Sequence, residues 1–453
     1  MNVAYLDPPY SRYFHKLAAR LAQPSGGSVV ALLSCPAYRL YAGGDRAQVW
    51  EPGAPAQEHV LPQAFERAGW AQSGSPEFGR AFSHAVEWFK ERFVAERVEI
   101  CLVFSDARPF SQAAHVAAQE LGVVCVFFER GAFRYRTASL STQGLNARFC
   151  LKQALQSPAL EAIPPFDLPP RRAVEPWLKL RFVGFMALNG VLSSLQPQRR
   201  PMQHKSYHFF NYLRIALKQF GAEHPELPVA QVPEPPPTSG PVVVLPLQLP
   251  TDSQFVMYSP FKHNQEFIDF VARQLRAVLP EAQLLVKKHP MDVRDYRMPT
   301  GARWIGGNLA RFHERPVVFV CLNSNVGFEA AIHGKPVLCF ADSFYTGHAS
   351  VTRVSREDFA QQLTAAAARP DDPAAGRALL AAVLRHYQSP GDVWAYVAAD
   401  LDFTATVLLQ QVRTARAAFR ARKGDFPADA GGLSWSAGAA PLSASDANDS
   451  SAV

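Results

Sequence analysis

The sequence has few cysteines and none of the cysteine patterns that build a metal site or a disulfide framework. Its 453 residues include six cysteines, without a CxxC pair and without clustering near histidine. These are Cys35, Cys101, Cys125, Cys150, Cys321 and Cys339. Four of them sit inside apolar runs, so we interpret them as small buried residues in a reducing compartment and expect neither a structural zinc ion nor another metal.

Targeting signals are also missing from the sequence. The first residues carry no basic segment followed by an apolar one, so we expect no secretion signal. No uncharged apolar run has the length of a membrane span. The excess of 46 basic over 39 acidic residues gives a net charge of only +7, so the distribution of charge matters more than its size. A hydrophobic fraction of 48% indicates a soluble globular protein, and this length favours two domains.

Apolar runs alternate with amphipathic patterns in two parts of the chain. In the first part, strands are predicted at 2–6, 27–35, 99–106 and 123–128, with a helix at 13–22. The same alternation returns after residue 241. This βαβ order indicates parallel sheets with right-handed crossovers, and we predict an α/β protein with two Rossmann-like domains.

Composition places the boundaries between these parts. A proline-rich stretch is typical of a linker, and the Ala, Ser, Gly and Asp of the last residues cannot bury enough surface to fold. We predict an N-terminal domain at 1–170, a basic aromatic helical region at 171–227, a linker at 228–241, a C-terminal domain at 242–402, a terminal helix at 403–423 and a disordered tail at 424–453.

Charged side chains follow two strands of the predicted N-terminal domain. Asp106 and Arg108 come after one, and Glu129, Arg130 and Arg134 come after the next. Ligands of open α/β sheets bind beyond the carboxyl ends of strands, so these residues predict a cleft, with Asp106 and Glu129 as catalytic candidates. That Glu129 and Arg130 only neutralise one another at a strand end is an equally open alternative.

The C-terminal domain contains a motif suited to binding an anion. In CLNSNVGFEAAIHGKP a buried strand stops at Leu322, Asn323 or Ser324 can cap the helix that starts near Val326, and Glu329 lies close to its first turn. Free amides at such a helix start favour a phosphate group. Many α/β proteins carry this pattern without using it.

Two further strand exits carry polar residues. Lys287 and Lys288 would neutralise a donor phosphate, and His289 could donate a proton to the leaving group, although a lone histidine is often structural. Asp252 and Ser253 follow another strand, where a simple turn or helix cap is the alternative.

Residues 171–218 are basic and rich in aromatic side chains. Nine Lys and Arg residues face the single acid Glu175. Such a region suits an anionic membrane leaflet, where each basic residue adds about 1 kcal/mol to binding. We expect Trp177, Arg199, Arg200 and Lys205 to contact membrane or acceptor. No nucleic-acid motif accompanies these charges, and the alternative is a solvated basic face.

Six collinear motifs resemble one known family, over nearly the whole predicted ordered chain. The chain resembles the capsule polysaccharide biosynthesis and export proteins of the KpsS/LipB type, which are related to the KpsC β-Kdo transferases. The motifs are FSDARP, FERGAFRYRTASLSTQGLN, HKSYHFF, LQLPTDSQF, KKHPMD and NSNVGFEAAIHGKPV with a following Tyr345.

This resemblance implies a GT-B fold and a retaining glycosyltransferase at the cytoplasmic face of the inner membrane. It would move Kdo from CMP-β-Kdo, a substrate and not a cofactor, to a phosphatidylglycerol-type lipid, with a capsule synthesis and export complex as further partner. His289, Asn323 and Ser324 would bind the CMP phosphate, Arg134 the sugar acid, and Glu129 would attack the anomeric carbon.

The sequence departs from the family pattern at several positions. Arg130 stands where relatives carry an acid, Tyr135 follows Arg134 in place of proline, and Ser139 and Ser141 replace a threonine and a glutamate. The N-terminal loop reads DPPYSR. Two alternatives therefore stay open: a catalytically silent subunit of the same assembly, and a transferase that uses another CMP-nonulosonic acid.

Overall fold

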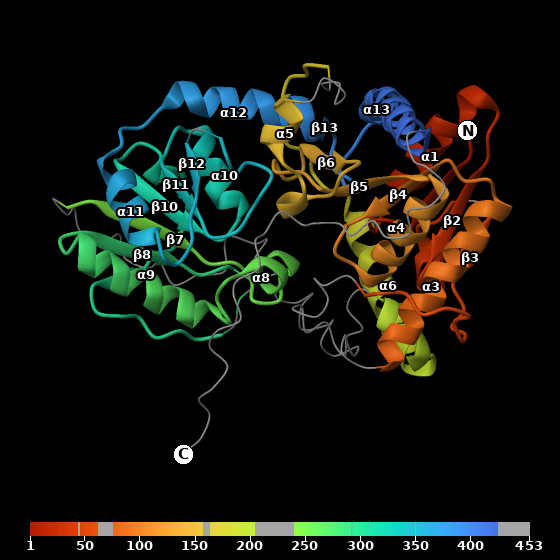
Figure 1. The fold of residues 1–453 in the computed structure, drawn as a ribbon, viewed down its shortest axis with the longest axis horizontal. Helices are drawn as coiled ribbons and strands as arrows, with labels where there is room; N and C mark the ends of the chain where they lie inside the picture. The colour runs from red at the N-terminus through yellow and green to blue at the C-terminus, as the bar shows by residue number, and fades with distance from the viewer. Residues whose placement is uncertain are drawn as a thin grey trace, which may run out of the picture.

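A computed structural model describes residues 1–43, 46–61, 76–156, 164–203, 240–290, 292, 294–307, 309–348 and 350–424. Residues 204–227 of the predicted basic region, almost all of the predicted linker and the tail beyond 424 lie outside these residues. The described chain forms two units, each built on a twisted sheet with helices packed against it (Figure 1).

The first unit contains a seven-stranded sheet in the order β13-β6-β5-β4-β1-β2-β3. The strands are β1 (Val3–Leu6), β2 (Val29–Leu33), β3 (Ala47–Val49), β4 (Ile100–Phe104), β5 (Val124–Arg130), β6 (Thr137–Ser141) and β13 (Gln388–Pro390). β1 to β5 are parallel, and β6 runs antiparallel to both of its neighbours. The strand order reverses between β1 and β4, which makes this point the expected ligand crevice.

The second unit repeats this arrangement with six parallel strands in the order β12-β11-β10-β7-β8-β9. They are β7 (Val242–Pro246), β8 (Gln283–Lys287), β9 (Ala302–Trp304), β10 (Val317–Cys321), β11 (Val337–Cys339) and β12 (Val351–Arg353). Its reversal point lies between β7 and β10. The prediction of two Rossmann-like α/β units is confirmed.

Helices connect these strands because their apolar residues recur at helical spacing. α1 covers the predicted residues and buries Phe14, Leu17, Ala18 and Leu21 on one face. The α-helices are α1 (Tyr13–Ala22), α3 (Pro76–Ala95), α4 (Pro109–Leu121), α5 (Leu151–Gln156), α6 (Pro176–Leu195), α8 (Ser253–Tyr258), α9 (Asn264–Val278), α10 (Asn325–Ile332), α11 (Phe359–Ala368), α12 (Pro373–His386) and α13 (Ala398–Gly424). Short 3₁₀ turns lie at Gln23–Ser25, Pro36–Leu40, Asn146–Arg148, Pro197–Met202 and Leu309–Phe312.

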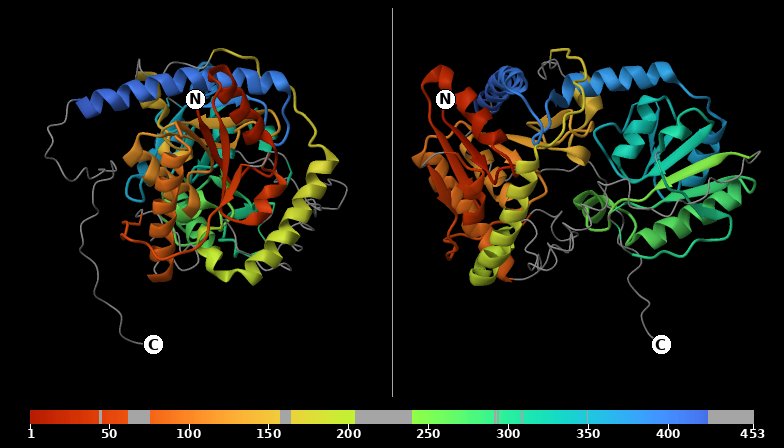
Figure 2. Two further views of the ribbon diagram at one scale, coloured as in Figure 1. Left: turned by 90° about the vertical axis from the view of Figure 1, so that its right-hand side faces the viewer. Right: turned by 180° about the vertical axis from the view of Figure 1, so that it is seen from behind.

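The C-terminal part of the chain returns to the first unit, which corrects two predicted boundaries. β13 pairs with β6, so Gln388–Pro390 belongs to the first sheet and not to the second domain. The fully buried Gln388 explains this placement, because its side chain bonds Thr137 and Ser139 of β6. α13 begins at Ala398, five residues before the predicted start, and packs against α1 (Figure 2).

An apolar seam joins the two units. The rings of Phe133 and Phe328 lie 5.6 Å apart across it, and Tyr387 stacks between Phe149 at 4.5 Å and Phe344 at 4.8 Å. These residues belong to one continuous buried cluster that extends into both sheets. The seam therefore fixes the position of the two units relative to one another. We use the term sheet edge for the side of each sheet at which the carboxyl ends of its parallel strands lie.

Candidate active site

Glu129 lies inside strand β5, not after it as the sequence predicts, and is paired with Ser139 of β6. Its Oε2 accepts a 2.8 Å hydrogen bond from Nδ2 of Asn146. Burial, followed by the nearby negative charge of Asp106, raises the pKa of Glu129 to about 7. A carboxyl group with this pKa changes its charge near neutral pH, which is typical of a catalytic acid, base or nucleophile.

Arg130 points to the opposite face of the same strand, because side chains alternate along β5. Its Nε lies 3.3 Å from Oδ2 of the fully buried Asp392, and its guanidinium group stacks between Tyr135 and Trp394. The alternative in which Glu129 and Arg130 neutralise one another is therefore wrong. An acid at position 130 would not lie beside Glu129 without a change of the strand.

Asp106 and Arg108 follow β4 at the reversal point of the first sheet. Asp106 is 2% exposed, and its Oδ2 accepts a 2.9 Å hydrogen bond from the amide of Leu145 and lies 3.8 Å from Nε of Arg148. Burial raises its pKa, against the opposing effect of Arg148. Asp106 thus acts on Glu129 through its charge, while it also anchors the loop that carries Asn146.

Arg108 is 5% exposed, and among the described residues its Nε and Nη1 atoms have no hydrogen-bond partner. Its guanidinium group stacks on the ring of Phe104, and the carboxylate groups of Asp7 and Glu129 lie close enough to stabilise its positive charge. Leaving two buried donors of a cation unpaired is costly. The arrangement suits the carboxylate or phosphate of a bound ligand.

Asp7 is a candidate that the sequence reasoning missed. It follows β1 at the same reversal point, is 5% exposed, and accepts hydrogen bonds from the amide and the hydroxyl group of Ser34. Burial raises its pKa to about 6, although Ser34 and Arg108 oppose the shift. Its position directly after the first predicted strand was the available signal, because the reversal point always includes the first strand of this order.

Asn323 lies at the reversal point of the second sheet and is held from several sides. Its Nδ2 donates to Oε1 of Gln254 and to the carbonyl oxygen of Asp342, both at 3.0 Å, and its Oδ1 accepts from Gln248. Because its side chain is occupied in this way, Asn323 shapes the loop before α10 and offers backbone groups to a ligand.

Ser324 is the N-cap residue of α10, which confirms the predicted helix start to within one residue. Among the described residues, its side chain caps no backbone amide of this helix, so the first amides stay available to an anion. Its carbonyl oxygen accepts a 2.6 Å hydrogen bond from the hydroxyl group of buried Tyr345. A Cβ at Gly327 would lie 2.6 Å from that hydroxyl oxygen, so the turn requires glycine.

The KKHP motif divides into two roles. Lys287 ends β8, and its Nζ donates a 2.6 Å hydrogen bond to the carbonyl oxygen of Gly307 while it faces Glu329. Burial lowers the pKa of Lys287 and also that of His289, against the opposing charge of Asp252 on His289. Lys288 turns away, with its Nζ 3.9 Å from Asp295 and above the ring of Tyr296, so the structure does not bring it to the site.

Asp252 is the N-cap of α8 and accepts a 2.9 Å hydrogen bond from the amide of Gln254, so the simple capping alternative is confirmed for it. Ser253 is the first residue of that helix. Asp252 nevertheless lies close enough to Glu129 and His289 for its charge to influence both.

Charged groups of the two units lie close enough to influence one another. The charge of Arg134, from the loop after β5, acts on Glu129 of its own unit and on His289 and Glu329 of the second unit. A direct contact adds to this, since Nε of Arg148 donates to the hydroxyl group of Tyr258 at 3.2 Å. Glu129 and Arg134 of the first unit thus lie close to Asp252, His289 and Glu329 of the second.

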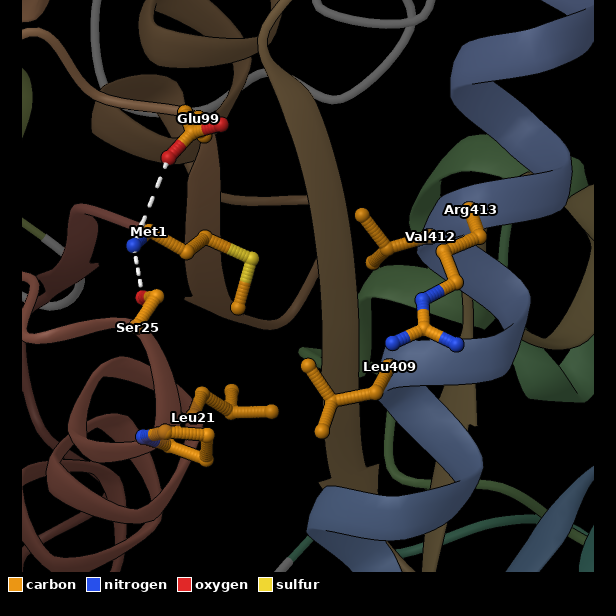
Figure 3. Close-up of a pocket in the computed structure, with 8 residues that line it drawn as sticks. Met1, Leu21, Ser25, Glu99, Leu409, Val412 and Arg413 are labelled. Carbon is orange, nitrogen blue, oxygen red and sulfur yellow. Dashed lines mark hydrogen bonds and ion pairs between the residues drawn. The ribbon is translucent and has the colours of Figure 1, made fainter.

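A cavity of about 380 Å³ lies elsewhere, between the end of α1, the N-terminus and α13 (Figure 3). Met1, Leu21, Leu409 and Val412 give it a largely apolar wall. It opens where β1 begins, whereas the candidate residues lie where the strands end. It is therefore not part of this site.

The residues that we predicted to contact the membrane differ in their exposure to solvent. Trp177 is 61% exposed on α6, but Arg199 is only 8% exposed and Nε of Arg200 donates to the carbonyl oxygen of Ser193 near the end of α6. The expected surface role is wrong for Arg199, because the turn at Pro197–Met202 folds it into the protein. Lys205 lies outside the described residues. By length and composition alone, α6 is apolar enough to cross a membrane.

Comparison with known proteins identifies the family. The sequence model described as "Capsule polysaccharide biosynthesis protein" matches residues 99–389, from β4 to β13. The chain belongs to this capsule polysaccharide biosynthesis family. The matched stretch contains Glu129, Arg134, His289 and Asn323, and it confirms the resemblance to the KpsS/LipB type.

Two curated relatives and two solved structures illustrate the similarity. The capsule polysaccharide modification protein LipB of Neisseria meningitidis serogroup B is 24% identical over 287 residues, which cover 57% of this chain and 67% of LipB. Protein FixF of Sinorhizobium fredii is 32% identical over 112 residues, 23% of this chain and 27% of FixF. The matched segment therefore spans about a quarter of FixF.

Among solved structures, the β-Kdo 2,7 transferase KpsC of Thermosulfurimonas dismutans aligns with 90% of this chain and 99% of its own, at 14% identity and a TM-score of 0.39. The calicheamicin glycosyltransferase CalG4 aligns with 84% of this chain and 94% of its own, at 13% identity and a TM-score of 0.30.

Proposed function

We propose that this capsule biosynthesis protein is a glycosyltransferase that moves Kdo from CMP-β-Kdo to a (lyso)phosphatidylglycerol-type lipid at the cytoplasmic face of the inner membrane. One observation carries the proposal: a carboxyl group with a pKa of about 7, Glu129, shares an electrostatic environment with Asp252 and Arg134 between two sheet edges. The proposal takes the nucleophile from the first unit and the phosphate-binding groups from the second, an arrangement that suits a nucleotide-sugar transferase of the GT-B type.

Donor binding would use the cations and amides of this site. The start of α10 and the ammonium group of Lys287 would bind the phosphate of CMP, and His289 would hydrogen-bond to the leaving oxygen. The unpaired nitrogens of Arg108, with Arg134, would bind the carboxylate of the sugar acid. Each of these roles matches a charge that CMP-Kdo carries.

Glu129 would then act as the nucleophile. Its ionised oxygen attacks the anomeric carbon, the bond from that carbon to the phosphate oxygen breaks, and CMP leaves with the electron pair. A lipid hydroxyl group next attacks the same carbon and loses its proton, and the Glu129 carboxylate is released. Two displacements give overall retention. Because only the ionised form attacks, the rate should fall in acid with a midpoint near pH 7.

The test uses the purified full chain with CMP-Kdo and lysophosphatidylglycerol, and it detects a Kdo-lipid by mass spectrometry. We expect Glu129→Gln to lower the transfer rate roughly 10³-fold, and His289→Ala to lower it as well. Glu91→Gln, on the exposed face of α3, is the matched control and should behave as the wild type.

Other outcomes would separate the alternatives. Absence of product from the wild type with any CMP-nonulosonic acid, together with retained lipid binding, would favour a silent subunit. Product only with CMP-sialic acid or another such donor would keep the enzyme and change the sugar. Full activity of Glu129→Gln would refute its role as nucleophile.

A further inference from the structure

We infer that a second cavity, beside α6, binds the phosphate headgroup of an anionic membrane phospholipid. This cavity of about 360 Å³ lies between the start of α1, the start of α6 and the loop after β13. Basic and aromatic side chains make up much of its lining. The inference rests on the proposed function insofar as that function needs a lipid surface.

The lining of the cavity is strongly basic. Four cations face one acid, Glu175, and Arg172 is already paired with Asp400. Within the described part of the chain, no carboxylate lies within 4.0 Å of the side-chain nitrogens of the other three, Arg12, Lys16 and Arg181. Three cations without an ion pair, around one concave space that holds a single acid, attract an anion, and a phosphate diester has the charge and size that such a space accepts.

Aromatic side chains give the same cavity the character of a membrane interface. Trp177, Trp394 and Tyr396 line it together with the cations, and the ammonium group of Lys16 lies 5.3 Å from the centre of the Tyr396 ring. Tryptophan and tyrosine favour the headgroup level of a bilayer, where one end of the ring is apolar and the other is wet.

An exposed apolar stripe on α6 begins at this cavity. Trp177 belongs to both, and one turn further along, Leu180 is 58% exposed; Val191 and Leu195 continue the stripe at 53% and 72%. The opposite face of the helix is buried through Phe185, Asn189, Gly190 and Ser193. Figure 2 shows α6 packed along one side of the first unit.

A bilayer matches this combination better than a soluble phosphate does. Acyl chains would cover the apolar stripe, while the headgroup of a lipid at the end of the stripe would enter the basic cavity. A free phosphate ion would leave the stripe exposed to water. We therefore commit to a phospholipid in a membrane as the occupant.

The experiment measures binding of the full chain to sedimented vesicles, without donor, so that it does not depend on catalysis. Vesicles of phosphatidylcholine alone are compared with vesicles that also contain phosphatidylglycerol. We expect the triple variant Arg12→Gln, Lys16→Gln, Arg181→Gln to lower the partition coefficient for the anionic vesicles on the order of 100-fold, because each cation contributes about fivefold.

Matched variants separate the cavity from general charge. Arg303→Gln, Arg377→Gln, Arg385→Gln removes the same charge from exposed positions of the second sheet and of α12 and should change the partition coefficient little. Leu180→Ser, Val191→Ser should weaken binding to both kinds of vesicle. The single variant Arg181→Gln, with an unfolding curve, guards against loss of fold in the triple variant.

Three results would overturn the inference. These are wild-type binding by the folded triple variant, an equal loss in the charge-matched control, and complete release of wild-type protein from vesicles by excess inorganic phosphate at constant ionic strength. Failure of the transferase assay with intact, cavity-dependent vesicle binding would instead count against the proposed function alone.

Discussion

The two units share one strand order around their reversal points, but they place different titratable groups there. At the reversal point of the first sheet and on the adjacent strand, the acids Asp7, Asp106 and Glu129 have raised pKa values; the first two are buried and Glu129 is half-buried. Around the second reversal point, Lys287 and His289 are bases whose pKa values are lowered. Burial opposes the charged form in both groups, so binding of a ligand of opposite sign would favour the charged form.

This difference shows how one topology serves two roles. An acidic edge suits attack on an electrophilic carbon, whereas an edge of cations and helix amides suits the binding of a leaving phosphate. The strand order determines where a ligand can bind in each unit. The residues that follow each strand determine whether that position suits attack on a carbon or binding of a phosphate. The predictions below test whether the two edges need one another and whether they differ as described.

The largest effect should come from removing the seam that holds the edges together. Phe328 is fully buried and touches Phe133 across the seam, so Phe328→Ala should lower the free energy of unfolding by about 3 to 5 kcal/mol. Urea unfolding of both single variants and of the double variant with Phe133→Ala would give the coupling between the rings, expected at about 1 kcal/mol. Strict additivity would mean that the two rings do not interact.

A smaller change in the free energy of unfolding, in the stabilising direction, is expected when Glu129 of the first sheet loses its charge. The pKa of Glu129 rises from 4.5 to about 7 on folding, so the protonated form is favoured in the folded state. Stability from this proton is present below pH 4.5 and is lost as the pH rises to 7. Glu129→Gln, which can still accept the bond from Asn146, should therefore be more stable than the wild type above pH 7, by about 3 kcal/mol.

Urea unfolding at pH 4 and at pH 8 measures this difference. The gain should shrink toward zero at pH 4, where the wild type is protonated in both states. Glu91→Gln on α3 provides the control at both pH values. A variant that is less stable than the wild type at pH 8 would show that Glu129 is not under electrostatic strain.

Much of the fold could be predicted from the sequence because its pattern is local. The spacing of Phe14, Leu17 and Leu21 gave α1 its observed bounds, and the capping residues before α10 gave that helix its start. β13 could not be predicted in the same way. Its three residues have no strand pattern, and they join the first sheet through long-range antiparallel pairing with β6 and through the side-chain bonds of Gln388.

Site residues divide along the same line. Glu129 and His289 stood out because charged residues directly follow apolar runs, and in the structure the charges of Asp252 and Arg134 act on both. The direction in which the side chain of Arg130 points could not be predicted. Strand β5 extends two residues further than expected, so Arg130 lies within the strand and its side chain faces Asp392. Asp7 was missed since its loop also reads as an ordinary turn, and its burial depends on Ser34 from the next strand.

The smallest effect should distinguish two neighbouring lysines at the basic edge. Lys287 ends β8 and faces Glu329 at the site, whereas Lys288 lies beside Asp295 and Tyr296. Lys287→Met should weaken the binding of CMP about tenfold, which corresponds to about 1.4 kcal/mol, as measured by calorimetric titration. Lys288→Met removes the same charge from the adjacent residue and should leave the affinity unchanged. If both variants lost affinity equally, the net charge of the edge and not the direction of the side chain would govern nucleotide binding, and the second sheet would lack the specific site that sets it apart from the first.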